Sequence, residues 1–519
     1  MKRNWNRGRI WTAAFMVFMA VGLSGCGGTE KAETQEEESG VVALAEQMKE
    51  EMEKQNAEAA AEAEAKSHVG EEKTVKIKTA KDLVKLRDRV NAGEVALEGI
   101  LEADIDLSSV CSESAGNWVP IENYNGSFDG GGHTITGLYI VTDEETPIGL
   151  FGETDDEAVI QNLGVKDSVI DGGSYAGAIV GKCSGTLANC WSDSQVSAIS
   201  KAAGGVAGFA KEMTGCYNLG NVTGDISWVG GVVGEMAGTI ADCYNQGNIL
   251  GNDFYTGGVV GLLGNESNTS QRVEAANCYN IGTVRGEICA GGVIGYAYNA
   301  WIDKCWNTAV VESPLTAGGV IGELNGHDDE SLMTNSFNKG AVSVVWEGVK
   351  SFYENKYVFR DQELGGLAGK CARSALVNCY NIGTLSSNQS EADYFLVGGL
   401  VGRAYASEYS FYYYNSFAAG HIDIHHEKAY INGIGAAKTD CDNTFFLEGR
   451  QMEASMRTGD GEPGNAPESF TDGTVLAALQ GWPENGNKDK QEWLNRFDEL
   501  GYELSGWKAG ESSPVFDWE

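Results

Sequence analysis

The sequence predicts an all-β protein whose main domain is a right-handed parallel β-helix, or β-solenoid, of about nine coils of ~27 residues each. Two observations carry this prediction: one glycine motif recurs at a nearly constant spacing, and the 519-residue chain holds 70 glycines but only 7 prolines. A unit of this length cannot bury its own apolar face, so it stacks on copies of itself. Equivalent segments then pair in parallel sheets that rise about 4.8 Å per coil. The right hand follows from the general handedness of parallel crossovers.

Composition limits the possible partners. The chain carries 37 basic against 74 acidic residues, which gives a formal net charge of -37. Nucleic acid is therefore excluded as a partner class, because phosphate binding needs a basic face. Hydrophobic residues make up 42% of the chain, which is too many for a generally disordered protein.

Residues 1–25 form a predicted signal peptide. Basic residues precede an apolar run from Ile10 to Leu23, which is too short for a membrane-spanning helix of about 20 residues. The run closes on Leu23-Ser24-Gly25-Cys26, which resembles the bacterial lipobox. This resemblance implies that Cys26 receives a diacylglyceryl group, a palmitate-type lipid, and becomes the mature N-terminus. We therefore expect an extracellular lipoprotein that is anchored to the cell membrane by its N-terminal lipid. The alternative is an ordinary secretory signal in which Cys26 is incidental.

Two segments precede the repeats. Residues 26–73 are rich in Glu and Ala and predict an acidic stalk that is helical or disordered. Residues 74–148 predict an N-terminal cap with entry coils, because residues 79–91 have the pattern of a capped amphipathic helix and residues 103–107 that of a strand. A cap is expected because a bare terminal coil exposes strand edges to other chains.

The repeat region spans residues 149–445. Each coil carries two adjacent glycines, two aliphatic residues and a third glycine, as in Gly230-Gly231-Val232-Val233-Gly234. Counted from the second glycine, the motif falls at positions 177, 205, 231, 258, 292, 319, 366, 399 and 433, and the larger separations mark insertions. Glycine is expected at these corners because it reaches positive φ without a Cβ penalty.

A second marker keeps the same period: a cysteine, an aromatic residue and an asparagine, as in Cys243-Tyr244-Asn245. Six cysteines occupy this position, namely Cys190, Cys216, Cys243, Cys278, Cys305 and Cys379. In a parallel stack they form a ladder of small buried side chains rather than disulfides, and Ser336 and Ser416 take the same position in other coils. The alternation of side chains along a strand does not settle whether the cysteine or the aromatic residue faces the core.

Together these motifs resemble the GLUG repeat of bacterial secreted and surface proteins, including the N-terminal regions of some IgA-specific metallopeptidases. Residues 128–138 also resemble the entry coils that precede such repeats in right-handed β-helix proteins. The resemblance covers about residues 75–445. It implies a β-helix, surface display and often adhesion, but it implies no reaction.

The sequence predicts no enzyme activity, no cofactor and no metal site. Residues 426–430 begin like the zinc-protease motif His-Glu-x-x-His, but Tyr430 stands where the second histidine belongs. No Cys-x-x-Cys pair is present, which disfavours structural zinc.

Three coils are longer than the others between the glycine motif and the cysteine position, at 258–278, 319–336 and 399–416. Insertions along one edge of a solenoid commonly carry binding, so we predict ligand contacts there. Aromatic rings beside amide and acidic groups stack on sugars and bond their hydroxyls. The predicted residues are Asn265, His327, Asp328, Tyr409, Phe411 and Tyr412. The alternative is that the aromatic residues pack the long loops onto the rod.

These patterns predict a non-catalytic surface protein that binds, or adheres to, a host or cell-wall glycan or a surface protein. Residues 446–519 predict a small C-terminal cap. Two alternatives stay open: a carbohydrate-active enzyme, either a polysaccharide lyase or a hydrolase, and an envelope spacer without a ligand. An enzyme needs convergent acidic and basic residues in a groove, a binder needs accessible aromatic and amide groups, and a spacer needs neither.

Overall fold

The computed structural model describes two compact units, one within residues 68–466 and one that contains residues 467–519. The described residues are 73–225, 227–264, 270–326, 330–345, 361–388, 394–405, 411–424, 429–435, 440–447, 465–482, 484 and 503–519. The predicted signal peptide, Cys26 and the predicted stalk lie outside them. Within the described part of the chain, no helix is long and apolar enough to cross a membrane.

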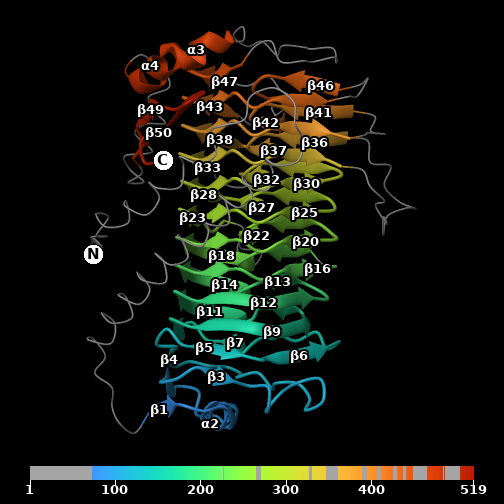
Figure 1. The fold of residues 1–519 in the computed structure, drawn as a ribbon, viewed down its shortest axis with the longest axis vertical. Coiled ribbons are helices and arrows are strands. Elements are labelled where there is room, and N and C mark those ends of the chain that lie inside the picture. The colour runs from blue at the N-terminus through green and yellow to red at the C-terminus, as the bar shows by residue number, and fades with distance from the viewer. Residues whose placement is uncertain are drawn as a thin grey trace, which may run out of the picture. The chain divides into compact units, whose positions relative to one another are not determined.

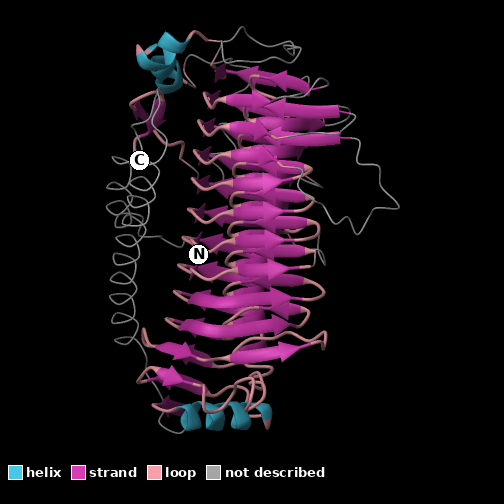
Figure 2. Cartoon of the chain, turned by 45° about the vertical axis from the view of Figure 1, so that its right-hand side comes forward, coloured by secondary structure: helices cyan, strands magenta, loops and turns pink. Residues whose placement is uncertain are grey.

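The first unit is a parallel β-helix, as the sequence predicts (Figures 1 and 2). Its strands form three sheets, which we number in the order in which a coil visits them after the glycine motif. Sheet I contains β1 (Thr74–Ile77), β2 (Glu98–Leu101), β4 (Ser127–Asp129), β7 (Phe151–Thr154), β8 (Val159–Gln161), β11 (Val180–Ala188), β14 (Ala207–Thr214), β18 (Val233–Ala241), β22 (Val260–Leu263), β23 (Val273–Ala276), β27 (Ile294–Tyr298), β28 (Ala300–Asp303), β32 (Ile321–Asn325), β33 (Ser331–Thr334), β37 (Ala368–Ala372), β38 (Ser374–Val377), β42 (Val401–Tyr405), β43 (Tyr412–Tyr414) and β47 (Asp440–Asp442).

Sheets II and III complete each coil. Sheet II contains β3 (Ile105–Asp106), β5 (Thr134–Thr136), β6 (Tyr139–Thr142), β9 (Gly164–Gly172), β12 (Trp191–Ala198), β15 (Tyr217–Asn218), β16 (Val222–Gly224), β19 (Tyr244–Asn245), β20 (Ile249–Gly251), β24 (Tyr279–Asn280), β25 (Val284–Gly286), β29 (Trp306–Asn307), β30 (Val311–Ser313), β34 (Phe337–Asn338), β35 (Val342–Val344), β39 (Tyr380–Asn381), β40 (Leu385–Ser387), β44 (Phe417–Ala418), β45 (Ile422–Ile424) and β48 (Phe445–Phe446). Sheet III contains β10 (Tyr175–Ala176), β13 (Ala202–Gly204), β17 (Trp228–Gly230), β21 (Tyr255–Gly257), β26 (Cys289–Gly291), β31 (Thr316–Gly318), β36 (Asp361–Gly365), β41 (Tyr394–Gly398) and β46 (Ala429–Asn432).

The strand register confirms the repeat and corrects one position in it. Gly204 pairs with Gly230, and Gly230 with Gly257, so equivalent glycines lie directly above one another. In the weaker copy near residue 177, Ala176 pairs with Ala203. Gly177 is therefore level with Gly204, the first glycine of its motif, and not with the second glycine as the sequence count assumed.

The glycines of the motif are required for a different reason than the sequence suggested. Positive φ occurs instead at the corner between sheets I and II, mostly at asparagines such as Asn189, Asn277 and Asn378. A Cβ on Gly231 would overlap the carbonyl oxygen of Gly258 in the next coil, and most other glycines of the motif meet similar backbone atoms. Close backbone approach, rather than positive φ, thus selects glycine at this corner.

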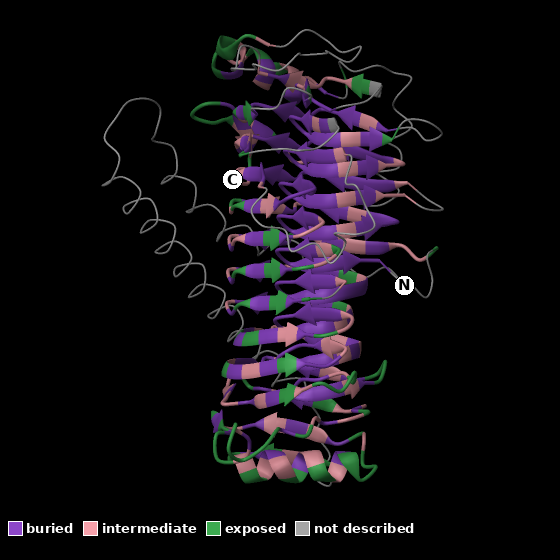
Figure 3. Ribbon diagram, turned by 90° about the vertical axis from the view of Figure 1, so that its right-hand side faces the viewer, coloured by how far each residue is buried: buried purple, intermediate pink, exposed green. Residues whose placement is uncertain are grey.

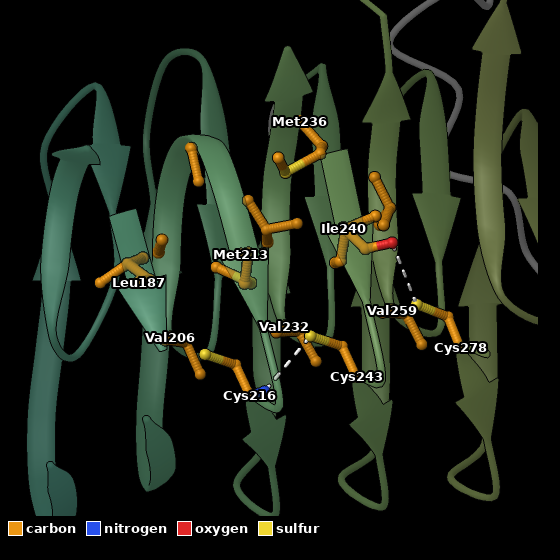
Figure 4. Close-up of a cluster of buried hydrophobic side chains, with 14 of the residues drawn as sticks. Leu187, Val206, Met213, Cys216, Val232, Met236, Ile240, Cys243, Val259 and Cys278 are labelled. Carbon is orange, nitrogen blue, oxygen red and sulfur yellow. Dashed lines mark hydrogen bonds between the residues drawn. The ribbon is translucent and has the colours of Figure 1, made fainter. Parts of the chain in front are cut away.

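The core confirms the cysteine ladder. Cys190, Cys216, Cys243 and Cys278 are fully buried free thiols in the hydrophobic core, and Figure 4 shows the last three of them. The backbone N–H of Cys216 donates to Cys243 Sγ across 3.3 Å. Ser336 and Ser416 take the place of cysteine in two coils, as the sequence predicts. Their Oγ atoms accept hydrogen bonds from the backbone N–H of Cys305 and Cys379, respectively, as Cys243 Sγ does from Cys216.

The aromatic residue after each cysteine points away from the core, which settles the alternation left open by the sequence. These rings stack along sheet II with centroids 4.3 to 5.8 Å apart and planes within 9° of parallel. The stack runs through Trp191, Tyr217, Tyr244, Tyr279, Trp306, Phe337, Tyr380 and Phe417. Ring stacking of this kind adds to the backbone pairing between coils.

The asparagine that follows points inward and forms a second ladder. Asn218 Nδ2 donates to Asn245 Oδ1 across 2.9 Å, and Asn245 Nδ2 donates to Asn280 Oδ1 across 2.8 Å. Each amide also bonds the carbonyl two residues later, usually that of a glycine, as Asn245 Nδ2 does with the Gly247 carbonyl at 2.8 Å. The buried amides are thus satisfied by one another, and the ladder fixes the coil register. Figure 3 shows how buried residues follow every coil.

A capped helix lies where the sequence predicts one, ahead of the repeats. Helix α2 (Ala80–Asn91) begins with a capping box between Thr79 and Asp82, and it buries Leu83, Leu86 and Val90 against the first coils. The helix lies at the N-terminal end of the β-helix (Figure 2).

Residues 467–519 belong to the second unit. It contains α3 (Pro467–Thr471), α4 (Thr474–Gly481) and an antiparallel pair, β49 (Trp507–Ala509) and β50 (Pro514–Phe516). Gln480 Nε2 donates to the Trp507 carbonyl across 2.8 Å, which joins α4 to β49. That these residues cap the last coil stays a prediction.

Candidate ligand-binding face

Sheets III and I meet at the glycine motif. Successive side chains of a strand point to opposite faces of the sheet. Val229 of sheet III and Met236 of sheet I belong to the core, so their neighbours Trp228 and Glu235 point outward. Outward side chains of the two sheets contact one another across the corner. Tyr255 of β21 and Tyr296 of β27 stack with ring centroids 4.6 Å apart. Such contact is possible only where the two sheets turn toward each other.

We call this surface the glycine-corner face and define it by two columns of residues. On sheet III, the column holds the residue two positions before the first glycine: Tyr175, Ala202, Trp228, Tyr255, Cys289, Thr316 and Glu363. On sheet I, it holds the residue after the closing glycine: Phe209, Glu235, Leu262, Tyr296, Glu323, Lys370 and Arg403. The columns run side by side along the β-helix.

The N-terminal half of the face is aromatic. Trp228, Leu262 and Tyr298 form a hydrophobic cluster with Ala202, separate from the core, and the rings of Tyr255 and Tyr296 pack against it while remaining partly exposed. Tyr175 meets Phe209 edge to face at 6.0 Å, and both rings are also partly exposed. This half of the face is therefore an apolar surface that includes partly exposed aromatic rings.

Polar groups border the aromatic half. Lys201 Nζ lies 5.2 Å from the ring centroid of Tyr175 and 5.5 Å from that of Trp228. Glu235 is only 4% exposed, and its Oε2 accepts a hydrogen bond from the Tyr175 hydroxyl at 3.1 Å. Burial raises the pKa of Tyr255 and of Tyr296, so both phenols stay protonated donors at neutral pH.

The C-terminal half of the face is charged. Arg403 Nη2 lies 2.6 Å from Asp361 Oδ2, and Arg403 Nε lies 3.2 Å from Glu363 Oε1. The other oxygen of Glu363 accepts from Thr316 Oγ1 at 2.8 Å. Burial raises the pKa of Glu363, although the positive charge of Arg403 opposes this shift. One guanidinium thus holds two carboxylates of sheet III.

A second ion pair lies beside it. Lys370 Nζ is 3.3 Å from Glu323 Oε2, and Asn325 Nδ2 donates to Glu323 Oε1 across 2.7 Å. Burial is the largest single influence on the pKa of Lys370 and would lower it, but Glu323, Tyr405 and Glu363 together outweigh burial and leave that pKa raised. Tyr405 is 38% exposed. Lys370 Nζ lies 5.4 Å and Arg403 Cζ lies 5.6 Å from the centroid of its ring.

Two buried polar atoms in the charged half have no hydrogen-bond partner. One is the donor Arg403 Nε, whose N–H is not aligned with the nearby carboxylate, and the other is the acceptor Asn325 Oδ1. Buried polar atoms normally find partners, and leaving one unsatisfied costs about 1–3 kcal/mol.

Four of the six predicted site residues lie outside the described residues, namely Asn265, His327, Asp328 and Tyr409. The insertions that hold them all interrupt sheet I at one place: between β22 and β23, β32 and β33, and β42 and β43. Each insertion starts within three residues of a face residue, namely Leu262, Glu323 or Arg403.

Two of the predicted residues are described. Phe411 is 2% exposed and meets Tyr413 edge to face at 4.6 Å. It packs against the core, which favours the alternative that the aromatic residues of the insertions hold the loops onto the rod. Tyr412 is half-buried in β43, level with Ala375 of β38.

The sequence analysis missed the glycine-corner face, although a signal existed. The face residues keep constant offsets from the glycine motif, but their chemistry changes from coil to coil: Trp228 is followed by Tyr255, then Cys289, then Thr316. A search for repeated residue types passes over such a column. Aligning coils by their glycines and comparing the variable positions would have found it. In the described part of the chain, no group of three His, Cys, Asp or Glu residues is placed to hold a metal ion.

The fold and this face define the class of molecule: a parallel β-helix with a lateral, mixed aromatic and charged surface. No family model matches the chain. A stretch of 99 residues, 17% of this chain, is 36% identical to halomucin of Haloquadratum walsbyi and covers 1% of that protein. Among solved structures, the chain resembles a Bacteroides ovatus protein described as a "putative immunoglobulin A1 protease", with a TM-score of 0.32 and 16% identity over 86% of this chain and 92% of that one.

Proposed function

We propose that this protein binds glycans at the cell surface through the glycine-corner face and does not alter them chemically. The observation that carries the proposal is the combination, on one face, of partly exposed aromatic rings with the partly exposed polar side chains of Asn325, Lys370 and Arg403. Sugar rings present apolar C–H faces and a rim of hydroxyls. Aromatic rings stack on the C–H faces, and fixed polar groups form hydrogen bonds with the hydroxyls.

Surface display is the second element of the proposal. The lipobox-like Leu23-Ser24-Gly25-Cys26 supports acylation of Cys26, which would anchor the protein outside the cell. Metabolic labelling with a palmitate analogue tests this directly. The wild-type chain should take up the label and Cys26→Ser should not, whereas equal labelling of both would remove the anchor from the proposal.

The binding experiment is a glycan-array and mucin-binding screen with the secreted Cys26→Ser chain. A double variant, Tyr255→Ala with Tyr296→Ala, should lower the affinity for the bound glycan by about tenfold or more, because both stacking faces are lost. The matched control is Leu250→Ala, which removes a 41% exposed apolar side chain from sheet II. Equal affinity in both variants would exclude this face as the binding site, and binding only to protein ligands would turn the proposal toward a protein partner.

The insertions are tested separately. Shortening residues 406–410 removes predicted site residue Tyr409 but leaves the face residue Arg403 in place. We expect weaker glycan binding, because residues 406–410 directly follow Tyr405, whose ring lies near Lys370 and Arg403. Unchanged binding would restrict the site to the face itself and exclude Tyr409 from it.

An enzyme is the second candidate, and the charged half favours it. Glu363 is a buried carboxyl with a raised pKa, the property that a general acid needs. Both of its oxygens are already engaged, by Thr316 and Arg403, which fits a positioning role better. Release of reducing ends or of unsaturated products from a bound glycan, abolished in Glu363→Gln, would establish the enzyme; intact glycan after prolonged incubation supports the binder.

A further inference from the structure

We propose that the glycan is a linear, uncharged polysaccharide that lies along the axis of the β-helix and contacts several coils at once. This inference rests on the proposed function and adds the shape and the charge of the ligand. It follows from the register of the face and from the pairing of its charges.

The aromatic contacts are distributed along the axis. Tyr175, Ala202, Trp228, Tyr255 and Cys289 occupy successive coils, and Tyr296 follows Cys289 in the same coil. Four steps of about 4.8 Å place Tyr175 and Tyr296 roughly 19 Å apart along the axis. A single sugar cannot touch both rings. A ligand that uses the whole aromatic half must therefore be an extended chain.

The charged half continues the same line. Thr316, Glu363 and Leu396 follow Cys289 at the next three coils of sheet III, and Arg403 lies in the coil of Leu396. The whole face thus spans seven steps, roughly 34 Å at about 4.8 Å per step. Along this length the rings come first and the ion pairs follow, so the two ends of a bound chain meet different chemistry.

The ion pairs indicate an uncharged ligand. Lys370 is matched by Glu323, and Arg403 by Asp361 and Glu363, so each described cation of this half already has a carboxylate partner. A charged sugar bound here would leave its own charge partly desolvated without compensation, which is costly. The formal net charge of -37 also repels acidic polysaccharides at long range.

The test is a length series measured by isothermal titration calorimetry on the Cys26→Ser chain. The probes are β-1,4-linked glucose oligomers and N-acetylglucosamine oligomers of two to six units, with oligogalacturonates as the acidic counterpart and deacetylated glucosamine oligomers as the cationic one. We expect the affinity for a neutral hexamer to exceed that for the dimer by about tenfold or more. Oligogalacturonates should bind at least about tenfold more weakly than the neutral hexamers.

Variants locate the chain on the face. Tyr175→Ala and Tyr255→Ala, which are three coils apart, should each weaken hexamer binding by about tenfold, while the dimer loses affinity in one of them only. Tyr255→Phe keeps the ring and should stay within about twofold of the wild type; circular dichroism checks that each variant folds.

The outcomes separate the inference from the proposed function. A dimer that binds as tightly as a hexamer, or a charged oligomer that binds more tightly than the neutral ones, would overturn the linear, uncharged ligand while leaving glycan binding intact. If no glycan in the series or on the array binds, both the inference and the proposed function fail.

Discussion

Tyr255 and Tyr296 stack across the glycine corner with ring centroids 4.6 Å apart and planes 16° from parallel. The contact joins sheet III to sheet I and also joins two coils, because Tyr255 is level with Cys289 of the coil that contains Tyr296. The same corner that forces glycine into the backbone thus brings outward rings together. Stability of the rod and the proposed binding surface arise from one geometric feature.

The first prediction concerns that backbone. In Gly231→Ala, the new Cβ would overlap the carbonyl oxygen of Gly258, and the parallel pairing leaves the backbone little room to move. We expect a loss of about 2 kcal/mol or more in the free energy of unfolding, measured by urea denaturation. Thr223→Ala, an exposed position on β16, is the control and should change it by less than about 0.5 kcal/mol. Equal stability of the two variants would refute close approach as the reason for glycine.

The second prediction concerns the asparagine ladder. Asn280→Ala removes the acceptor of Asn245 Nδ2 and the donor to Asn307 Oδ1, inside a fully buried row. Each orphaned group costs about 1–3 kcal/mol, so we expect a large loss of unfolding free energy. Asn248→Ala, exposed in the neighbouring loop, is the matched control and should be nearly neutral. A comparable midpoint of urea unfolding in both variants would show that the ladder is dispensable.

The sequence predicted the positions at which nearly every coil has the same residue. It missed the positions that recur in every coil but hold different residues. Cys243 and Asn245 were found because nearly every coil has the same residue there, and their packing follows from stacking identical coils. Trp228 and Arg403 were missed, because a binding face needs different chemistry at equivalent places. The reason for the glycines was also misjudged, since steric crowding between adjacent coils exists only once coils are stacked.

The third prediction concerns pH. Burial raises the pKa of the Cys379 thiol from 9.0 to about 12. Because the folded pKa is the higher one, the unfolded chain loses this proton first; the contribution to stability is complete below about pH 9 and is lost as pH rises toward about 12. Urea midpoints should therefore fall between pH 8 and pH 10.5, and Cys379→Ser should reduce that fall. Serine is the appropriate replacement, because Ser336 and Ser416 occupy the same position in other coils. A pH dependence that is identical in the variant would contradict this account.

The last prediction compares a buried with an exposed arginine. Arg403 is 17% exposed and neutralises Glu363, which is 9% exposed, together with Asp361, whereas the ion pair of Arg285 and Glu312 leaves Arg285 63% exposed. Arg403→Ala leaves two carboxylates without their cation and should cost roughly 3 kcal/mol of unfolding free energy at pH 7. Arg285→Ala should cost less than about 1 kcal/mol.

The deficit of Arg403→Ala should shrink as the pH is lowered to 4. The pKa of Glu363 is already raised by burial, and loss of the guanidinium raises it further. A carboxyl with a raised folded pKa stabilises the fold at pH values below its unfolded pKa, where it holds its proton, and loses that contribution as the pH rises. The variant therefore regains stability in acid while Arg285→Ala does not change in this way. Urea unfolding of both variants at pH 4 and pH 7 measures the difference, and a deficit that stays constant with pH would show that Arg403 acts through packing and not through its charge.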